Sequence, residues 1–572
     1  MSNKINLVIC WHMHQPHYKD GLDGEYHLPW VYLHAIKDYT DMAAFIEQNP
    51  NSKAVVNYTP VLIEQLNEYA SQMRHWLNTS QPMCDPLLNL VSGASPIPAC
   101  EQQRKEIVIA CRKAHAPTMI ETLPAFGALF KLADAHFPED NFKGNDLNYL
   151  NEQFYIDLLI WYHIAWIGSS IRLTDSRVND LIEKANNFSN ADQRKLIEIY
   201  ADHIETIIPR YKALQDNGQI EISMTPYGHP IVPLLLDFNT MRDALPDAPA
   251  PKYNKYPGGF DRSNWHMEHG IAIFEQQFGQ KPKGVWLSEG AVSDDAIDLL
   301  DDYEIKWTAT GEGVWRNSCH AAEINSDDID SKRLLYQPTK ISDKACKIFF
   351  RDDGLSDLIG FQYKDWQPEH AVSNFIHHIE NIANQLGDES DKHLIPVILD
   401  GENAWEYYPD NASHFLKLLY KKLAEHPDIN MTTFSNALEN ELKELVLPSL
   451  QAGSWVYGSF STWIGDADKN IGWDLLVEAK RTYDQIVSIG KLTSNQLKQA
   501  TEQLAICEGS DWFWWFGDYN PSGSVQDFDG LYRRHLRKLY DLLNVEAPEK
   551  LNHPISQGGC DAENSGTMRR NV

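Results

Sequence analysis

The stretch that decides the fold is Val397-Ile398-Leu399-Asp400-Gly401-Glu402-Asn403-Ala404-Trp405-Glu406-Tyr407-Tyr408. The apolar run that leads into it, from Leu394 to Leu399, predicts a buried strand of a parallel sheet. The run ends in an acid, a glycine and a second acid, and three aromatic residues follow. Barrels and open α/β enzymes keep their chemistry at the carboxyl ends of such strands, so Asp400 is a candidate catalytic residue.

A second segment has the same design. Gly284-Val285-Trp286-Leu287-Ser288-Glu289-Gly290 is an apolar strand that ends in an acid near a tryptophan. Sugars stack on aromatic faces and their hydrolysis needs a pair of carboxylates, so Glu289 and Asp400 together indicate a site that breaks glycosidic bonds. A strand-end acid can also be a simple N-cap of the next helix. Two such acids, each with aromatic neighbours, favour the functional interpretation.

Composition excludes several classes of partner. The chain has 572 residues, enough for two to four domains, and a formal net charge of −30. The electric field of this negative net charge repels phosphate backbones and anionic lipid, which argues against nucleic-acid and membrane partners. The eight cysteines include no CxxC pair, so a zinc ribbon or thioredoxin motif is excluded. We see no signal peptide and no apolar run long enough to span a membrane, and therefore expect a cytoplasmic protein.

Single strands separated by helical stretches, without hairpin signals, predict a parallel barrel of seven or eight strands. The expected strands are residues 5–10, 54–57, 219–223, 284–287, 307–310, 347–350, 394–399 and 429–433. Glu221 alternates with apolar neighbours in the third of these, so it is expected to face the barrel interior near a ligand.

The loop after the first strand contains His12 and His14. They are two residues apart, so in an extended segment they point the same way. They could be a metal pair or two hydrogen-bond donors to sugar hydroxyls, and both interpretations remain open at this point.

The rest of the chain is predicted to be mainly helical. Residues from about 75 to 215 form a helical insertion, in which Asp192 to Leu214 is an amphipathic helix with a kink at Pro209. Helices return after about residue 440, where Thr493 and Gln496 form a capping box. The aromatic run from Trp512 to Phe516 fits a sugar platform and an interdomain contact equally well.

Five motifs give the chain a family resemblance. In order they are His12-Met13-His14-Gln15-Pro16, Gly218-Gln219-Ile220-Glu221-Ile222, Trp286-Leu287-Ser288-Glu289, Leu399-Asp400-Gly401-Glu402, and Ser461-Thr462-Trp463-Ile464-Gly465-Asp466, which continues to Trp473. They resemble the conserved regions of glycoside hydrolase family 57, the retaining α-glucan-active family. The fourth and fifth motifs, with Asp511 to Trp515, are most similar to its amylopullulanase-like branch, whose members include α-amylases.

The resemblance implies a fold and a set of roles. The fold is an α/β protein, a (β/α)7 barrel with helical insertions over residues 1–435, followed by a C-terminal α-helical domain over 436–550 that completes the cleft. The polar tail, 551–572, is expected to be weakly ordered. Glu289 is implied as nucleophile and Asp400 as general acid/base, without metal or cofactor. The residues implied to bind the oligo- or polysaccharide are His12, His14, Gln15, Glu221, Trp286, Trp405, Trp463, Asp466 and Trp473.

Three alternatives remain beside an α-1,4- or α-1,6-acting hydrolase. A 4-α-glucanotransferase or branching enzyme of the same family would use the same acids with a sugar as acceptor. A metal-dependent hydrolase would instead use His12 and His14 with Asp400 as ligands. A catalytically silent glucan-binding protein would bind the substrate without cleaving it. The sequence is compatible with any oligomeric state.

Overall fold

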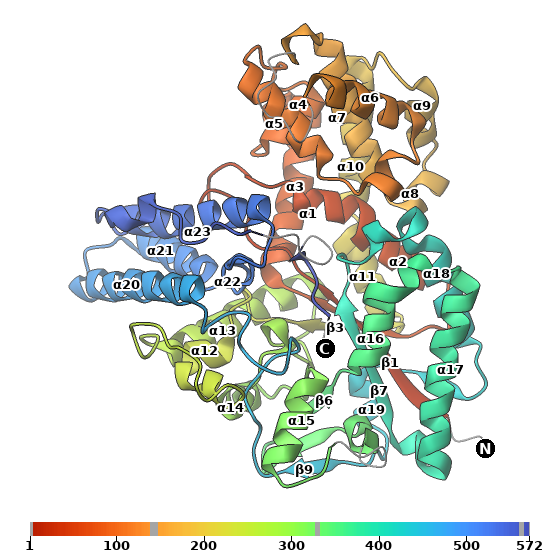
Figure 1. Cartoon of the computed structure of the whole chain (residues 1–572), viewed down its shortest axis with the longest axis vertical. Helices are drawn as coiled ribbons and strands as arrows, with labels where there is room; N and C mark the ends of the chain where they lie inside the picture. The colour runs from red at the N-terminus through yellow and green to blue at the C-terminus, as the bar shows by residue number, and fades with distance from the viewer. Residues whose placement is uncertain (1–3, 138–146, 327–331, 560–565, 571–572) are drawn as a thin grey trace.

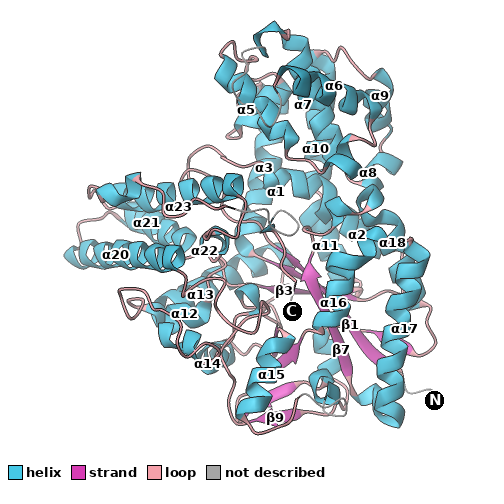
Figure 2. Ribbon diagram, in the orientation of Figure 1, coloured by secondary structure: helices cyan, strands magenta, loops and turns pink. Residues whose placement is uncertain are grey.

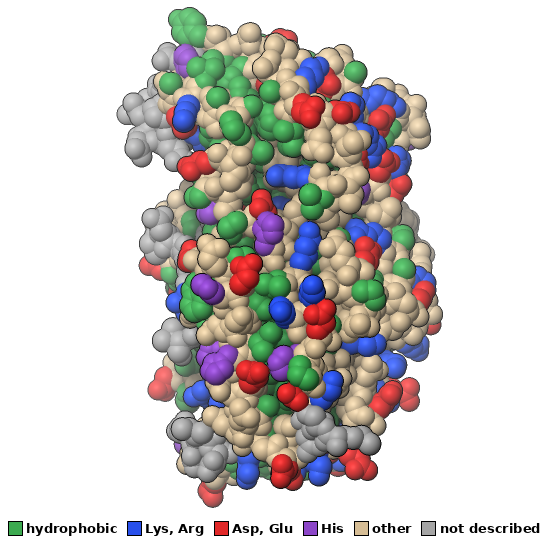
Figure 3. Space-filling view, turned by 90° about the vertical axis from the view of Figure 1, so that its right-hand side faces the viewer, with side chains coloured by type: hydrophobic (Ala, Val, Ile, Leu, Met, Phe, Trp, Pro, Cys, Tyr) green, Lys and Arg blue, Asp and Glu red, His purple; other side chains and the backbone are tan. Residues whose placement is uncertain are grey.

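The computed structural model describes residues 4–137, 147–326, 332–559 and 566–570. Helices surround a group of strands in the lower half of the molecule (Figures 1 and 2). None of the helices in these ranges is both long and apolar enough to cross a lipid bilayer. On the face shown in Figure 3, acidic and basic side chains are interspersed, so the negative net charge is not gathered there into one patch.

Seven extended segments close into a parallel ring, which confirms the predicted (β/α)7 barrel. They are β1 (Ile5–Met13), β2 (Ala54–Tyr58), β3 (Ile220–Met224), the segment 284–287, β4 (Trp307–Thr310), β6 (Lys347–Phe350) and β7 (Leu394–Asp400). β1 pairs in parallel with β2 and β7, and β2 pairs with β3. Single parallel bridges join Met224 to Val285 and Gly284 to Trp307, and β4 pairs with β6. The backbone N–H of Asp352 donates to Pro396 O and closes the ring.

The expected strand at 429–433 is β8 (Ile429–Met431), which pairs with the first residues of β1 outside this ring. Two short strands, β5 (Thr339–Ile341) and β9 (Leu445–Leu447), extend the sheet beyond β6.

The barrel interior is a packed core. It is filled by Val8, Cys10, Val55, Trp286, Trp307, Ala309, Phe349, Leu394 and Ile398, with Phe434 and Ala437 of α19 (Phe434–Leu438). Glu221 lies near the start of β3, at the amino-terminal end of the barrel. Its carboxylate accepts hydrogen bonds from Trp307 Nε1 (2.7 Å) and from Ser435 N and Oγ. It therefore joins β3 to α19 at the end of the barrel opposite Asp400.

The long helical insertion lies between β2 and β3, at the top of Figure 1. Its helices after α3 (Pro60–Thr79) are α4 (Pro86–Ser92), α5 (Glu101–Arg112), α6 (Pro124–His136), α7 (Glu152–Trp166), α8 (Ser169–Thr174), α9 (Ser176–Lys184), α10 (Asn190–Ile204) and α11 (Ile207–Asp216).

The single helix predicted over 192–214 is wrong, because the structure has two helices, α10 and α11. Pro209 lies in the first turn of α11, where backbone N–H groups need no helical partner. Its ring would clash with the carbonyl of Glu205 in a continuous helix. The chain therefore breaks at residues 205–206, one turn before the proline.

Four C-terminal helices lie on the left of Figure 1: α20 (Ala467–Ile489), α21 (Ser494–Cys507), α22 (Asp511–Trp515) and α23 (Ser522–Leu542). The predicted capping box of Thr493 and Gln496 is confirmed at the start of α21. Within the described part of the tail, Leu551, Ser556 and Met568 are buried, whereas residues 552–554, 557 and 559 are exposed.

A buried ionic cluster fastens these helices to the barrel. Glu508, at the end of α21, is fully buried and accepts hydrogen bonds from Arg262 Nη2 (2.7 Å) and His266 Nε2 (2.8 Å) of α13 (Gly259–Phe278). Arg262 Nε and the Tyr256 hydroxyl also donate to this carboxylate, at 2.8 Å and 2.5 Å. Burial alone would raise the pKa of Glu508, but the Arg262 charge and the His266 hydrogen bond outweigh it and hold that pKa at about 2.

We expect Glu508→Gln to lower the free energy of unfolding by roughly 3–5 kcal/mol, because the buried Arg262 charge loses its counter-charge. Urea denaturation followed by fluorescence measures the loss. Glu47→Gln is the matched control, since Glu47 pairs with Arg210 with 39% of its side chain exposed and such surface pairs contribute about 0–1 kcal/mol. Equal losses of unfolding free energy in the two variants would contradict the role of Glu508 in joining α21 to α13.

Candidate active site

A cavity of about 750 Å³ lies at the carboxyl ends of the strands and contains both predicted catalytic acids. Three parts of the chain line it. The barrel contributes His12, His14, Gln15, His229, Glu289, Asp400 and Glu402; the insertion contributes residues 112–116 and Trp166; the C-terminal helices contribute Asp511, Trp514, Trp515 and Phe528. Aromatic walls with a few convergent polar groups are typical of a ligand site.

The conformation of Glu289 is unusual for a non-glycine residue. Its φ is +60°, in the left-handed region, where a side chain is sterically disfavoured. Trp455 holds both the backbone and the side chain of Glu289. Its backbone N–H donates to Glu289 O (3.1 Å), and its Nε1 donates to Glu289 Oε2 (3.0 Å). Ser510 Oγ lies 3.4 Å from the other oxygen, Oε1. Strain of this kind persists where the surroundings over-determine it, as at active sites.

Asp400 ends β7 directly beside His12 of β1, and Asn403 Nδ2 donates to its Oδ2 at 2.8 Å. The next residue is Gly401, where a Cβ would lie 2.1 Å from Met13 Sδ, so any other residue would require the Met13 side chain to move. This close approach to β1 allows Gly401 N to donate to His12 O. The short Asp-Gly-Glu sequence thus turns the chain tightly over the first strand.

Three carboxyl groups are buried together. Burial first, and then the charges of Asp400 and Asp511, raise the pKa of Glu289 to about 8. Burial raises the pKa of Asp400 to about 6, although Asn403, His14 and Arg351 oppose this. Burial and the Asp400 charge raise the pKa of Glu402 well above its usual value. Between about pH 6 and pH 8 these values leave one proton on the Glu289 and Asp400 pair, on Glu289 rather than on Asp400.

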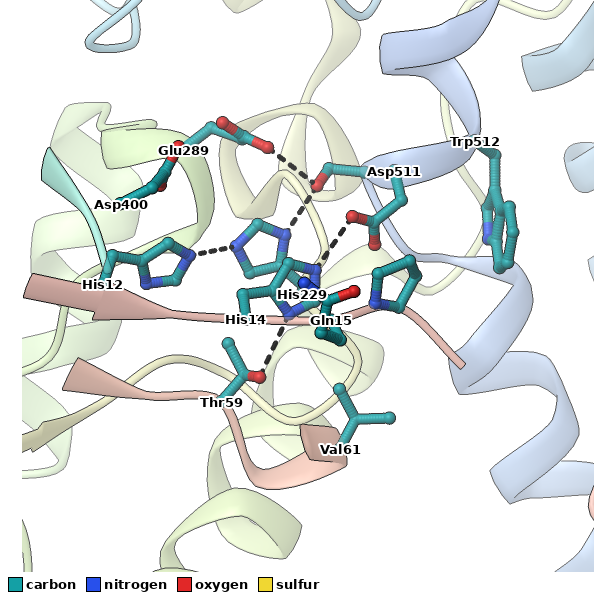
Figure 4. A network of polar contacts seen from close by, with 12 residues as sticks. His12, His14, Gln15, Thr59, Val61, His229, Glu289, Asp400, Asp511 and Trp512 are labelled. Atoms are coloured by element: carbon teal, nitrogen blue, oxygen red, sulfur yellow. Dashed lines mark hydrogen bonds and ion pairs between the residues drawn. The ribbon is translucent and has the colours of Figure 1, made fainter. Parts of the chain in front are cut away.

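The histidines form a hydrogen-bonded chain that ends at Glu289 (Figure 4). His12 Nδ1 lies 2.6 Å from Asn57 Oδ1, and its Nε2 lies 3.2 Å from His229 Nε2. His229 Nδ1 is 2.7 Å from Ser510 Oγ, which contacts Glu289. Burial, and then His14, lower the pKa of His12 to about 3, so this ring is neutral near pH 7.

A second set of contacts surrounds His14. Its Nε2 lies 2.8 Å from Asp511 Oδ1 and its Nδ1 lies 3.0 Å from Thr59 Oγ1, while its ring stacks on His229 with centroids 3.7 Å apart. His14, His229 and Asp511 offer ligand atoms within 4.8 Å of one another, a different set from the His12, His14 and Asp400 considered above. In the structure these atoms are already hydrogen-bonded.

The structure brings five of the predicted site residues to the cavity: Glu289, Asp400, His12, His14 and Gln15. It does not bring Glu221, which is hydrogen-bonded at the other end of the barrel as described above. Asp466 is exposed, and its carboxylate caps α20 by accepting from Asp468 N. Strand position and capping chemistry decide where these two carboxylates lie, and both lie outside the cavity.

The four predicted stacking tryptophans are buried outside the cavity lining. Trp286, Trp405, Trp463 and Trp473 are each at most 1% exposed, and none is among the described residues that line the cavity. Trp405 Nε1 donates to Gly401 O and Trp473 Nε1 donates to Trp463 O, so both indoles are used in internal packing. A tryptophan beside a strand end can point into the core as readily as into the cleft.

Sequence reasoning missed His229, Asp511, Ser510 and Trp455 as site residues. His229 was visible as a polar residue after a strand, and Asp511 as the acid at the head of the aromatic run. Trp455 follows no strand or motif, so no sequence signal identifies it. The aromatic run from Trp512 to Phe516 is used in two ways. Trp514 and Trp515 line the cavity, while Trp512 and Phe513 pack on Tyr532 of α23.

Comparison with known proteins identifies the family. The chain matches the profile of Glycosyl hydrolase family 57 over residues 8–451. It belongs to glycosyl hydrolase family 57. The 1,4-alpha-glucan branching enzyme TK1436 of Thermococcus kodakarensis is 21% identical over 397 residues. That match covers 58% of this chain and 55% of the relative, so it spans little more than half of the relative's length.

Two solved structures share the fold of this family 57 chain. A GH57-type branching enzyme from Pyrococcus horikoshii has a TM-score of 0.55 at 16% identity, and the match covers 100% of each chain. The alpha-amylase AmyC from Thermotoga maritima has a TM-score of 0.56 at 14% identity, with 96% of this chain and 95% of that chain covered. At such low identity the likeness concerns the fold alone.

We expect the pH dependence of turnover to be bell-shaped. Above about pH 8 both carboxyl groups are ionised and no acid remains. Below about pH 6 both carboxyls are protonated and no nucleophile remains. Asp400→Asn should remove the basic limb and most activity on substrates with poor leaving groups. An unchanged basic limb in initial-rate measurements on this variant would contradict the acid role.

We expect dialysis against EDTA to leave the rate unchanged, and elemental analysis to find no stoichiometric metal. The three candidate ligands then serve only as hydrogen-bonding groups. A metal that is lost in His14→Ala and Asp511→Asn, together with activity that chelation removes and the ion restores, would overturn the mechanism below.

Proposed function

We propose that this chain is a retaining glycosidase that cleaves α-1,4 linkages of α-glucans by double displacement, with α-1,6 linkages as a second class of substrate. The observation that carries the proposal is the pair Glu289 and Asp400, which lie in one cavity, have pKa values raised by burial and carry one proton between about pH 6 and pH 8. For the attack this proton must lie on Asp400, so that Glu289 is ionised. Double displacement requires this combination of one acid and one carboxylate.

Glu289 supplies the nucleophile. Its carboxylate attacks the anomeric carbon and forms a glycosyl-enzyme, while Asp400 protonates the departing glycosidic oxygen. Trp455 and Ser510 hold the two carboxylate oxygens and so orient the attack. In the second step Asp400 takes a proton from the acceptor, and the sugar leaves Glu289 with its original anomeric configuration.

The remaining cavity residues bind the substrate. The ring nitrogens of His12, His14 and His229 contact protein groups in the ligand-free structure, so a sugar hydroxyl would replace one of these partners. Trp514 and Trp515, which are 7% and 9% exposed, line the cavity wall. A neutral glucan enters a cavity with three buried carboxyls without the repulsion that an anionic substrate would meet. We also propose that the chain divides near residue 435, with the C-terminal helices completing this cleft.

Transfer to a second sugar is the alternative within the same mechanism. It is favoured by the relatives named as branching enzymes, and by a cavity with room for several sugar units. A chromatographic product profile with maltoheptaose, pullulan and glycogen separates the two activities. Short products indicate hydrolysis, longer or branched products indicate transfer, and cleavage of pullulan to maltotriose indicates α-1,6 activity.

Glu289→Ala should lower turnover by several orders of magnitude with the fold intact, because the covalent step is lost. Azide should restore part of the turnover on an activated glycoside and yield the glycosyl azide of inverted configuration. Glu304→Ala, a substitution at an exposed acid outside the cavity, is the control. A near-normal rate for Glu289→Ala would exclude this residue as the nucleophile.

A further inference from the structure

The end of the chain passes close to the acid/base residue. Residues 566–570 run from the C-terminal helices to the centre of the molecule, where the letter C marks the end of the chain in Figure 1. Trp514 Nε1 donates to Gly566 O at 2.7 Å, and the Arg569 guanidinium lies over the rings of Trp514 (4.5 Å) and Tyr519 (4.6 Å). Met568 is 8% exposed. These contacts hold the segment in place.

Beneath this segment is a second cavity, of about 40 Å³. It is lined by Arg351, Gly360, Phe361, Leu399, Asp400, Trp455, Val456, Trp514, Thr567, Met568 and Arg569. Asp400, Trp455, Trp514 and Thr567 also line the main cavity, so the two cavities share a wall. Asp400 is therefore in contact with both.

The size and lining of this cavity suit water. A cavity needs about 10–15 Å³ to hold one water molecule, and the water needs two to four polar partners. Asp400 and Thr567 supply polar groups beside 40 Å³ of space, which is too small for a sugar ring. The guanidinium groups of Arg351 and Arg569 also line it, but they donate to Ile398 O, Asp353, Asp357, Thr462 and Trp514 O. A water molecule there would be within reach of the residue that acts as base in the second step.

We propose that this cavity is the water site of Asp400, lined on one side by residues 567–569, and that it sets how the glycosyl-enzyme divides between water and a sugar acceptor. The inference rests on the proposed function. In the hydrolytic step the water oxygen forms a bond to the anomeric carbon, the bond from that carbon to the Glu289 oxygen breaks with its electron pair returning to the carboxylate, and the water proton passes to Asp400.

The arrangement matters because glucan bound in the main cavity displaces bulk water from the acids. Water held in the small cavity remains beside Asp400 while the main cavity is occupied. A substitution that fills the small cavity should then favour transfer to a sugar, and one that opens the cavity to solvent should favour hydrolysis.

The experiment measures products from maltoheptaose in H₂¹⁸O, since hydrolysis places ¹⁸O at the new reducing end and transfer does not. Gly360→Ala adds a methyl group 3.4 Å from Leu399 Cδ2, and both residues line the small cavity. We expect it to lower the labelled fraction about two- to fivefold, the effect of losing a well-placed water contact. Arg569→Ala, which loosens the lining segment 567–569, should raise the labelled fraction.

Matched controls are Gly530→Ala, where an added Cβ has no atom within 4 Å, and Arg534→Ala, an exposed arginine outside both cavities. Both should keep the wild-type fraction. If Gly360→Ala does not fold, Thr567→Val removes a polar partner at similar volume and should also lower it. A labelled fraction unchanged in every folded cavity variant would overturn the water site, whereas a wild-type enzyme that neither cleaves nor transfers would instead overturn the proposed function.

Discussion

The buried contact between Glu508 and Arg262 is the interaction on which the site depends. It joins α21 to α13 where no water can screen the two charges, and His266 and Tyr256 use the remaining acceptor capacity of the carboxylate. Two residues later Ser510 N donates to His229 O (2.9 Å), and Gly509 forms a bridge with Pro230. The Glu508–Arg262 ion pair thus fixes how the C-terminal helices pack against the loop that follows β3.

The docking of the C-terminal helices also determines the position of the Glu289 carboxylate. The two side chains that contact the Glu289 carboxylate, Trp455 and Ser510, both come from beyond the barrel strands. His229, whose φ is +58°, contacts Ser510 on one side and His12 on the other. The barrel therefore supplies Glu289, and segments that follow the barrel strands in the sequence orient its carboxylate.

The insertion completes the enclosure from the opposite side. Lys113, just after α5, pairs with Asp527 of α23 at 2.6 Å, and Thr118 Oγ1 donates to Glu406 O in the loop that follows β7. These contacts connect the insertion to the C-terminal helices and to the loop of the acid/base residue. Enclosure by three parts of the chain accounts for the burial that raises the proton affinity of both acids.

The sequence by itself determined the barrel and its acids. Continuous apolar runs such as Leu394 to Leu399 specify strands buried on both faces, and a polar residue at the end of such a run must lie at the open edge. Glu289, Asp400 and His12 were predictable for this reason. The family resemblance added Gln15, which also lines the cavity.

Only the tertiary structure decided which side chains meet there. Ser510 and Glu289 are 221 positions apart, and their contact exists because a buried ion pair elsewhere sets the docking of whole helices. Trp405 and Trp514 have similar aromatic neighbours in sequence, yet one indole is enclosed in the core and the other lines the cavity. Local pattern specifies an element and its buried face, whereas the direction of a flanking side chain depends on packing with distant segments.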